Sequence, residues 1–316
     1  MNFEAFKAHI VQQYGLELIG EWKPDGKFHY LSTSEDRKTR KPFRYVVNLD
    51  SPQNVHYCDL KRGFSGTWFP ECRETLTPEQ RRQWAQRQAQ IRQDRAAQEQ
   101  AQYEKTAAIA SRLWHTAPPA PETHPYLARK KVLPNGIRQA ERWIKRIQIE
   151  TGEWDNLIIE NPLLVPLFDE FGKLWNLQAI FPEPHPLLGR DKDFLSKGRK
   201  RGLLFWTGPK PKAKTDRLCL AEGFSTGASI TQETGYRTYI AFDAGNLPVV
   251  AQIIRKYYPE NPIIVCCDYD RLNNQGYRTG IKFGEQAANL VNGFVAVPPI
   301  EGTDFNDFAA MLREAV

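Results

Sequence analysis

The chain has 316 residues, of which 41% are hydrophobic and 25% are charged. This length allows two or three domains, and this composition is typical of globular proteins, so wholesale disorder and collagen-like repeats are excluded. No apolar run approaches the ~18–20 residues that cross a bilayer, and the first residues lack the basic start and apolar core of a signal peptide. We therefore expect a cytoplasmic protein with no membrane partner.

The net charge is +6, but the basic residues are concentrated in one segment. Residues 190–214 contain nine basic and two acidic side chains. This density favours a polyanionic partner, although a solvated loop has the same composition. The five cysteines show no regular spacing and no C-x-x-C pair, which argues against a disulfide framework and a zinc ribbon. Cys219, Cys266 and Cys267 lie in apolar runs and are expected to be buried.

Residues 1–75 are predicted to form a small N-terminal unit that is mainly β. We expect a helix near residues 2–14 and strands at 43–49 and 56–60. Aromatic side chains alternate here with arginines and lysines, including Arg37, Lys38 and Arg40. Such a pattern suits stacking of nucleic-acid bases and binding of phosphates, but it is equally typical of a small core with a charged rim.

Residues 76–116 are predicted to contain one long helix. Thr77, Pro78 and Gln80 have the pattern of a helix N-terminus, and neither Gly nor Pro follows until Pro118. Large apolar residues are too sparse for a buried stripe. We therefore expect a solvent-exposed strut, with a coiled-coil face as the alternative.

Residues 117–214 are predicted to form a basic α+β subdomain. Strands at 163–168 and 174–180 flank a turn, in which Gly172 takes the position that needs a positive φ. Short strands at 194–195 and 203–206 flank a basic loop, residues 196–202, which we expect at the tip of a hairpin. The two glycines of this loop let the backbone approach a ligand closely.

Residues 215–316 alternate between apolar strands and helices. Strands are expected at 217–221, 238–242, 262–267 and 294–297, and helices at 225–235, 247–258, 281–291 and 305–314. Because the strands are apolar without a two-residue alternation, we predict an α/β fold with a parallel sheet and helices on both faces.

Acidic residues follow the expected carboxyl ends of these strands, where open parallel sheets bind ligands. Glu222 follows the first strand, Asp268 and Asp270 follow the third, and Asp304 precedes the last helix. Clustered carboxylates repel one another, and a divalent cation removes that cost; oxygen ligands favour Mg²⁺ or Mn²⁺ over zinc. Asp304 could instead be only a helix N-cap, and Asp243, after the second strand, could be only a turn former.

Four motifs in this region resemble the Toprim domain of plasmid- and phage-type DNA primases. They are LAEGFSTG from Leu220, AFDAGNL from Ala241, CDYD from Cys267 and GTDFND from Gly302. Three upstream motifs are similar to the basic half of the same primase core, which resembles a bacterial primase without its zinc ribbon. They are HPYL from His124, VPLF from Val165 with LWNLQ from Leu174, and FLSKG from Phe194.

The resemblance implies a primase that synthesises short RNA primers on single-stranded DNA from nucleoside triphosphates, with Mg²⁺ or Mn²⁺. It further implies replication of a plasmid, phage or other mobile element. The implied catalytic residues and metal ligands are Glu222, Asp268 and Asp270, with Asp304 as a further ligand. The implied binders of nucleotide or nucleic-acid phosphates are Arg190, Lys192, Lys197, Arg199, Lys200 and Arg201. Supporting roles are implied for Gly223, Asp243 and Asn246.

Two features depart from the family pattern. The chain has no zinc ligands of a template-reading ribbon, so either residues 1–75 replace the ribbon in binding the template, or initiation is weak. It also has no helicase domain, which implies a separate replicative helicase as partner, or a longer primase–helicase of which this chain is a piece. Two alternatives stay open: a Toprim nuclease that uses the same acids, and a non-catalytic accessory protein that binds single-stranded DNA.

Overall fold

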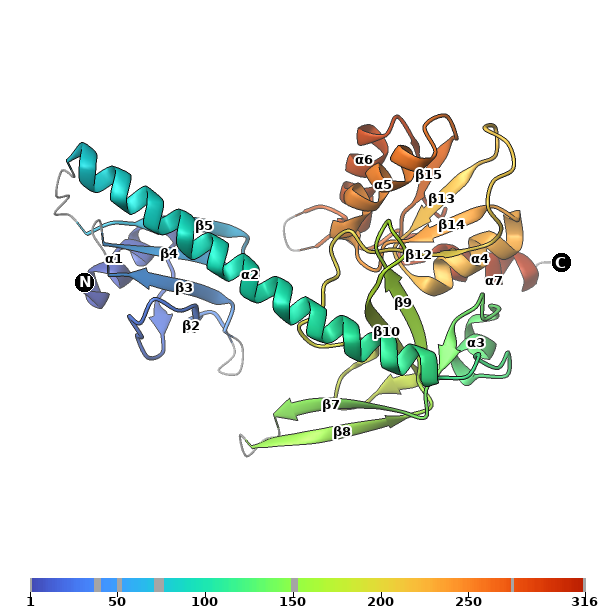
Figure 1. The fold of residues 1–316 in the computed structure, drawn as a ribbon, viewed down its shortest axis with the longest axis horizontal. Helices are drawn as coiled ribbons and strands as arrows, with labels where there is room; N and C mark the ends of the chain where they lie inside the picture. The colour runs from blue at the N-terminus through green and yellow to red at the C-terminus, as the bar shows by residue number, and fades with distance from the viewer. Residues whose placement is uncertain are drawn as a thin grey trace. The chain divides into compact units, whose positions relative to one another are not determined.

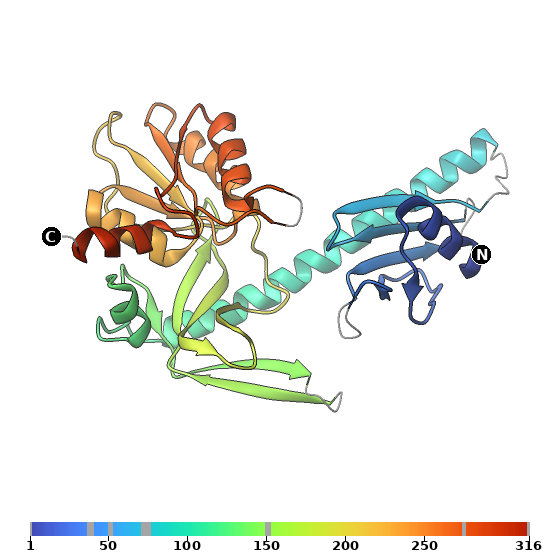
Figure 2. The same ribbon diagram turned by 180° about the vertical axis from the view of Figure 1, so that it is seen from behind.

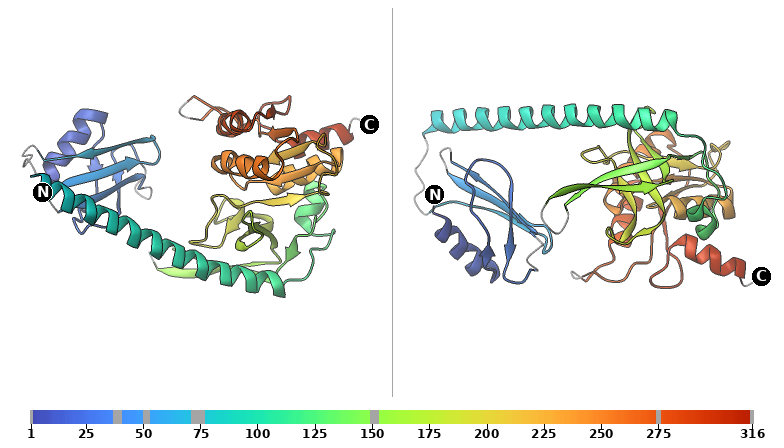
Figure 3. Two further views of the ribbon diagram at one scale, coloured as in Figure 1. Left: turned by 45° about the horizontal axis from the view of Figure 1, so that its top comes forward. Right: turned by 90° about the horizontal axis from the view of Figure 1, so that it is seen from below.

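The structure is a computed structural model that describes residues 2–36, 41–49, 53–70, 77–148, 153–273 and 276–314. It divides into two compact units, residues 1–96 and 97–316. The boundary falls within α2 (Pro78–Thr116), which Figure 3 shows as one unbroken helix. The division at residues 75, 116 and 214 stays a prediction. Among the described helices, none combines the length and the apolar character needed to span a bilayer.

The first unit contains an antiparallel sheet and one helix. α1 (Phe3–Tyr14) begins at Asn2, whose side chain accepts a hydrogen bond from the Glu4 amide, and it ends at Gly15 with φ 69°. The five strands pair in sequence order and are β1 (Leu18–Ile19), β2 (His29–Thr33), β3 (Phe43–Asn48), β4 (Asn54–Asp59) and β5 (Phe64–Trp68). The predicted helix and both predicted strands are confirmed.

Many aromatic residues of this unit form its core. Phe43, Tyr45 and Tyr57 are buried against α1, whereas Phe28 and Tyr30 are exposed. The basic residues Arg37, Lys38 and Arg40 lie outside the described residues. Because Phe43, Tyr45 and Tyr57 are buried, fewer aromatic rings are available on the surface to stack on bases than the sequence pattern implies.

The C-terminal half of α2 belongs to the core of the second unit. Thr106, Ala107 and Ala110 are buried, and Tyr103 and Trp114 pack beside them. An exposed strut is therefore correct for residues 92–101, which are all exposed, and wrong for the end of the helix. The prediction considered only large apolar residues, whereas the small residues Thr106, Ala107 and Ala110, three to four positions apart, form the buried stripe.

The middle of the chain forms a four-stranded antiparallel sheet in the order β11-β10-β9-β6. Its strands are β6 (Arg138–Gln139), β9 (Leu163–Phe168), β10 (Leu174–His185) and β11 (Arg190–Phe194). The predicted turn between β9 and β10 is confirmed, with φ 84° at Gly172. The sequence did not reveal a separate hairpin of β7 (Arg142–Gln148) and β8 (Trp154–Glu160), which extends from this sheet (Figure 2).

A short helix, α3 (Pro125–Lys130), precedes this sheet and accounts for the HPYL motif. His124 is its N-cap: Nδ1 accepts a hydrogen bond from the Tyr126 amide, and Nε2 donates to the carbonyl oxygen of Asn161. This histidine therefore has a structural role.

The C-terminal part is a parallel sheet with helices on both faces, as predicted. β14 (Arg237–Ile240), β13 (Leu218–Ala221), β15 (Ile263–Cys266) and β16 (Phe294–Ala296) are parallel neighbours in that order, and β12 (Phe205–Thr207) adds an antiparallel edge. α4 (Phe224–Thr234) contacts α7 (Phe305–Glu314) on one face, and α5 (Leu247–Tyr257) contacts α6 (Thr279–Leu290) on the other (Figure 1). Cys219, Cys266 and Cys267 are buried, as predicted.

The basic loop does not lie at the tip of a hairpin. β11 pairs with β10, and β12 pairs with β14, so residues 195–204 connect two different sheets. The hairpin prediction was wrong because it paired two short strands that are close in sequence, whereas each of them pairs with another strand. The loop therefore joins the antiparallel sheet to the parallel sheet.

We predict that Gly284→Ala destabilises the protein although alanine favours helices. A Cβ at Gly284, in α6, would collide with Sγ of Cys267, which directly follows β15. Such overpacking costs about 1–3 kcal/mol of the free energy of unfolding, more than the ~1 kcal/mol that alanine gains over glycine in a helix. Urea denaturation measures this loss. The exposed neighbour Gln286→Ala is the control and should unfold like the wild type. Adding Cys267→Ala to Gly284→Ala should restore most of the stability, and an undiminished single variant would contradict the packing.

Candidate active site

The parallel sheet has a topological switch point between β13 and β15. From β13 the chain continues to β14 on one side of it, and from β14 it crosses to β15 on the other side. Loops that leave the carboxyl ends of strands diverge at such a point, and open α/β sheets bind their ligands there. Glu222 directly follows β13, and Asp268 and Asp270 follow β15. The acids therefore flank the position where this topology favours a ligand.

These acids are close enough to act on one another. Burial first, and then the charges of Asp270 and Asp243, raise the pKa of Glu222 to about 7. Burial, followed by the charges of Glu222, Asp304 and Asp270, raises the pKa of Asp268 to about 7. The structure thus brings together, at one edge of the sheet, acids from four separate loops.

Asp268 offers an acceptor that the protein does not use. Its Oδ1 is buried and has no hydrogen-bond partner among the described residues. Gly280 packs close by, since a Cβ there would lie 3.2 Å from the carbonyl oxygen of Asp268 and 3.4 Å from a carboxylate oxygen of Asp270. A buried carboxylate oxygen without a partner costs free energy, and a cation relieves that cost. This donor set therefore fits a hard divalent ion.

The carboxylates do not yet form a set of metal ligands. In the described ranges, no three His, Cys, Asp or Glu side chains are gathered closely enough to hold a metal ion. We call Glu222, Asp268, Asp270 and Asp304 the acidic cluster; its side chains would have to move closer together to hold an ion. The roles of Glu222, Asp268, Asp270 and Asp304 as metal ligands stay predictions.

Lys192, on β11, is a cation whose charge acts on both Glu222 and Asp268. Its Nζ lies 3.9 Å from the position that a Cβ would take at Gly223. Burial lowers the pKa of Lys192, but surrounding negative groups, including Asp304 and Asp268, raise it by a larger amount. The pKa of Lys192 is therefore higher than its usual value. Among the described residues, none of the four acids is sealed in an ion pair with a lysine or arginine. The acidic cluster therefore remains available to a ligand.

Asp304 has the N-cap role that the sequence left open. Its Oδ1 accepts a hydrogen bond from the Asp307 amide at 2.9 Å, and its Oδ2 accepts one from the Thr226 hydroxyl at 3.1 Å. Asp307 lies in the first turn of α7, and its Oδ2 accepts a hydrogen bond from the Asp304 amide at 3.3 Å. The cap holds the Asp304 carboxylate beside Asp268, on whose pKa it acts.

The turn after β14 contains a strained residue. Phe242 is buried and has φ 69°, a left-handed conformation that costs a side chain of this size about 1–2 kcal/mol. This turn places Asp243 where its charge acts on Glu222. Backbone strain of this kind concentrates at functional sites.

Two buried asparagines fix the basic loop. Asn246 accepts a hydrogen bond from the Gly202 amide at 2.8 Å and donates to the carbonyl oxygens of Leu203 at 2.9 Å and Ala241 at 2.8 Å. Asn176, on β10, donates to the carbonyl oxygen of Arg199 at 2.9 Å. The loop is therefore held by one residue of β10 and by one residue of the turn between β14 and α5.

The six predicted phosphate binders have different surroundings. Lys197, Lys200 and Arg201 are exposed in the loop. Arg199 is half-buried, and its guanidinium lies 5.2 Å from the ring centre of Trp175. Arg190 instead pairs with Asp193 at 2.9 Å, an acid that also binds Lys145 and Trp143. Of the two predicted binders on β11, Lys192 is thus near the acids, whereas Arg190 shares the charge of Asp193 with Lys145.

Two functional residues, Thr226 and Asn176, were not predicted from the sequence. Thr226 lies in the LAEGFSTG motif, and its hydroxyl can be recognised as a partner only once Asp304 is placed next to it. Asn176 gave a signal, because it is a polar residue in an otherwise apolar strand, LWNLQAIF. A buried amide in such a position usually binds backbone groups.

Comparisons with known proteins agree with the predicted family. Residues 217–313 match the family model described as the Toprim domain. Two curated proteins, both DNA primase TraC of Escherichia coli, are 27% identical over 277 and 297 residues, which is 87% and 92% of this chain. The chain spans only 24% and 19% of their lengths. A DNA primase domain from Pseudomonas aeruginosa is 13% identical with a TM-score of 0.44, over 65% of this chain and 74% of that one. The resemblance to Toprim-domain primases of the plasmid type is confirmed by the family model and the two curated relatives.

We predict that the acidic cluster makes stability depend on pH. Because the pKa of Asp268 rises from 3.8 in the unfolded chain to about 7 on folding, the stability contributed by its proton is present below pH 4 and is lost as the pH rises through 7. Asp268→Asn should therefore gain Tm over the wild type as the pH increases from 5 to 8 in EDTA. Between pH 5 and 7 this loss is about 1.4 kcal/mol per pH unit, so the Tm difference should widen by several degrees, at about 2–4 °C for each kcal/mol.

Thermal melts across this pH range measure the difference. Glu122→Gln removes an exposed carboxylate outside the cluster, and its Tm difference from the wild type should stay constant. A constant difference for Asp268→Asn as well would mean that Asp268 is not desolvated and repelled as described.

Proposed function

We propose that this chain is the catalytic part of a DNA primase that makes short RNA primers on single-stranded DNA. The observation that carries the proposal is the convergence of Glu222, Asp268, Asp270 and Asp304 at the switch point of a sheet that matches the Toprim domain. A loop dense in basic residues is anchored at the same edge through Asn246. Acids for a metal beside cations for phosphates are what nucleotidyl transfer requires.

We further propose that Glu222, Asp268 and Asp270 bind Mg²⁺ or Mn²⁺, with Asp304 as a further ligand. Such an ion, when bound, neutralises phosphate charge and activates a hydroxyl as the nucleophile. The protein itself contributes carboxylates with raised pKa values, which can accept a proton near neutral pH. Lys192 contributes a fixed positive charge next to them.

The substrates and partners in this proposal are single-stranded DNA, nucleoside triphosphates and a separate replicative helicase, in the cytoplasm. Support comes from the names of the curated relatives, both DNA primases. The exposed Lys197, Lys200 and Arg201 would bind template or nucleotide phosphates, and the unit of residues 1–75 would bind the template. In this arrangement Asn246 and Asn176 are positioning residues for the loop.

We predict that Asp268→Ala abolishes primer synthesis and leaves template binding nearly intact. The purified protein is incubated with a single-stranded template, labelled ribonucleotides and Mg²⁺ or Mn²⁺, and the products are resolved by size. Loss of one metal-binding carboxylate should reduce synthesis by at least 10²-fold, since charge stabilisation at such sites is worth several kcal/mol. Asp155→Ala, an exposed acid of β8, is the control.

The same assay separates the alternatives. Labelled short RNA supports the primase, a fragmented template supports a Toprim nuclease, and binding without any product supports an accessory protein. Primer synthesis that survives Asp268→Ala would mean that the site is wrongly assigned.

We predict that replacing Lys197, Lys200 and Arg201 together by alanine weakens binding of single-stranded DNA. Each lost phosphate contact should lower the slope of log K against log salt by about 0.7, so the triple variant should lose about 2. Fluorescence anisotropy of a labelled oligonucleotide at several salt concentrations measures both effects. Replacing the exposed Lys212 and Lys214 removes charge outside the loop and serves as the control. An unchanged slope in the triple variant would exclude the loop from phosphate binding.

A further inference from the structure

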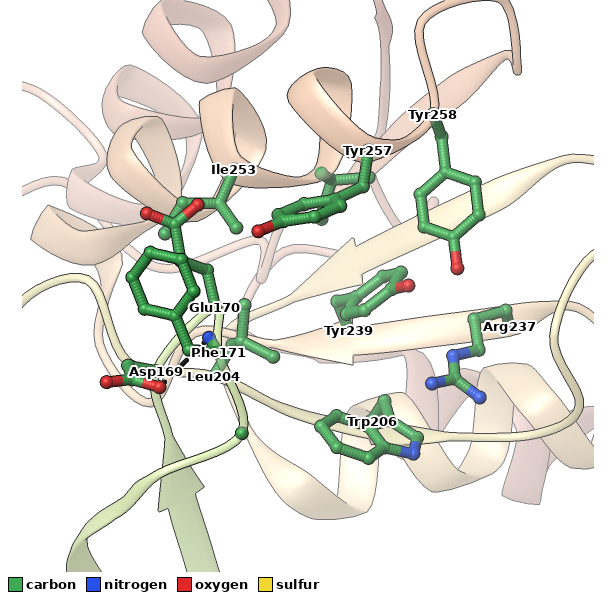
Figure 4. A pocket seen from close by; sticks show the side chains of 12 residues that line it. Asp169, Glu170, Phe171, Leu204, Trp206, Arg237, Tyr239, Ile253, Tyr257 and Tyr258 are labelled. Atoms are coloured by element: carbon green, nitrogen blue, oxygen red, sulfur yellow. Dashed lines mark hydrogen bonds between the residues drawn. The ribbon is translucent and has the colours of Figure 1, made fainter.

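A pocket that contains none of the residues of the acidic cluster lies between the edge of the parallel sheet and α5. Its volume is about 310 Å³, which is at the lower end of the range for small-molecule sites. Figure 4 shows its walls: Trp206 from β12, Tyr239 from β14, and Tyr257 and Tyr258 from the end of α5. Residues 169–172, the turn between β9 and β10, close one end. All of these residues belong to the second unit.

A buried arginine without an acidic partner lines this pocket. Arg237 is only 8% exposed, and its Nη1 donates a hydrogen bond to the carbonyl oxygen of Gly208 at 3.0 Å. Its Nε is buried and has no partner among the described residues, and none of their carboxylates lies within ion-pair distance of it. The guanidinium lies 5.0 Å from the ring centre of Trp206 and 5.3 Å from that of Tyr239. These rings only partly replace the counter-charge that a buried cation needs.

The two ends of the pocket carry opposite charges. Figure 4 shows Arg237 at one end, with the hydroxyls of Tyr239 and Tyr258 directed to the same end. Asp169 and Glu170 lie at the other end. Asp169 is occupied by hydrogen bonds from the Phe171 amide and the Trp175 indole, and Glu170 pairs with Lys256 at 2.6 Å. The end at Arg237 therefore attracts one anionic group, and the acidic end repels a second.

The apolar walls suit a flat ring. Phe171 is 80% exposed and Tyr257 is 49% exposed, so part of each ring is accessible beside the pocket. Stacking of a base on an aromatic ring is worth about 1–3 kcal/mol. A second cation, Lys256, lies 5.3 Å from the ring centre of Tyr257 and 5.8 Å from that of Phe171, but it is paired with Glu170. One unpaired cation without a row of lysines does not match a continuous phosphate backbone. Size, flat walls and one cation together favour a single nucleotide.

We propose that this pocket binds one nucleoside 5′-monophosphate unit, with its base against the aromatic walls and its phosphate at Arg237. The unit is either a free nucleotide or the 5′-phosphorylated end of a strand. The proposal does not rest on primer synthesis, because it concerns a pocket separate from the acidic cluster.

Titration calorimetry of the full chain in EDTA tests the proposal, because chelation removes metal-dependent nucleotide binding at the acidic cluster. The probes are AMP, adenosine, the 5′-phosphorylated dinucleotide pApA and N-acetylphenylalanine. We expect saturable binding of AMP and at least tenfold weaker binding of adenosine. Binding of pApA as well as AMP assigns the site to strand ends, and binding of AMP alone assigns it to free nucleotides.

Two variants link binding to the pocket. Arg237→Gln should weaken AMP binding at least tenfold, and Tyr257→Ala, a change at an exposed position, should weaken it several-fold without a risk to folding. Arg217→Gln is the matched control, since Arg217 is an exposed arginine at the start of β13 that stacks on Tyr236. Equal AMP affinity in the wild type and both pocket variants would overturn the proposal.

Two further outcomes would also overturn it: no saturable AMP binding, or binding of N-acetylphenylalanine in place of AMP, which would make the pocket a site for a peptide carboxylate. Failure here is distinguishable from failure of the proposed function. If the protein makes primers but does not bind AMP in EDTA, only the proposal of nucleotide binding at the Arg237 pocket is refuted. If it binds AMP through Arg237 but makes no primers, only the proposed primase activity is refuted.

Discussion

Repulsion among the carboxylates at the carboxyl ends of β13 and β15 is the constraint on which the site depends. A folded chain does not gather Glu222, Asp268 and Asp304 at one edge without a cost, because each is partly desolvated and lies near like charges. The fold opposes this cost with the charge of Lys192 and with the hydrogen bonds that Asp304 accepts. A protein that bears such a cost uses it for binding or catalysis more often than for structure.

The surroundings of the acids are built from segments that are far apart in sequence. Lys192 comes from the antiparallel sheet, Thr226 from the start of α4, and Asn246 from the turn before α5. Their hydrogen bonds and charges connect the two sheets of the second unit around a single edge. Phe242, with its strained φ of 69°, lies at the same edge. Backbone strain and side-chain charge are therefore found at the same place in the fold.

The sequence was most informative where local pattern and tertiary role coincide. The parallel sheet could be predicted because both faces of its strands are covered, and the acids could be placed because carboxyl ends of parallel strands share one edge. The pairing of β11 and β12 with different sheets could not, since three-residue and five-residue strands carry no partner signal. The buried face of α2 was missed because alanine is apolar but small, and Arg237 was missed because a charged residue at a strand start is normally solvated.

The hydrogen bonds of Asn176 and Asn246 also restrict how the basic loop, residues 196–202, can vary in length. Surface loops ordinarily accept inserted residues at little entropic cost. Here the backbone is fastened at Arg199 by Asn176 and at Gly202 by Asn246, which leaves only Lys200 and Arg201 between the two fastenings. One additional residue in that interval would have to bulge outward or break a buried amide contact. Residues 199–202 therefore have a fixed length, which keeps Lys200 and Arg201 at a fixed distance from the edge of the sheet.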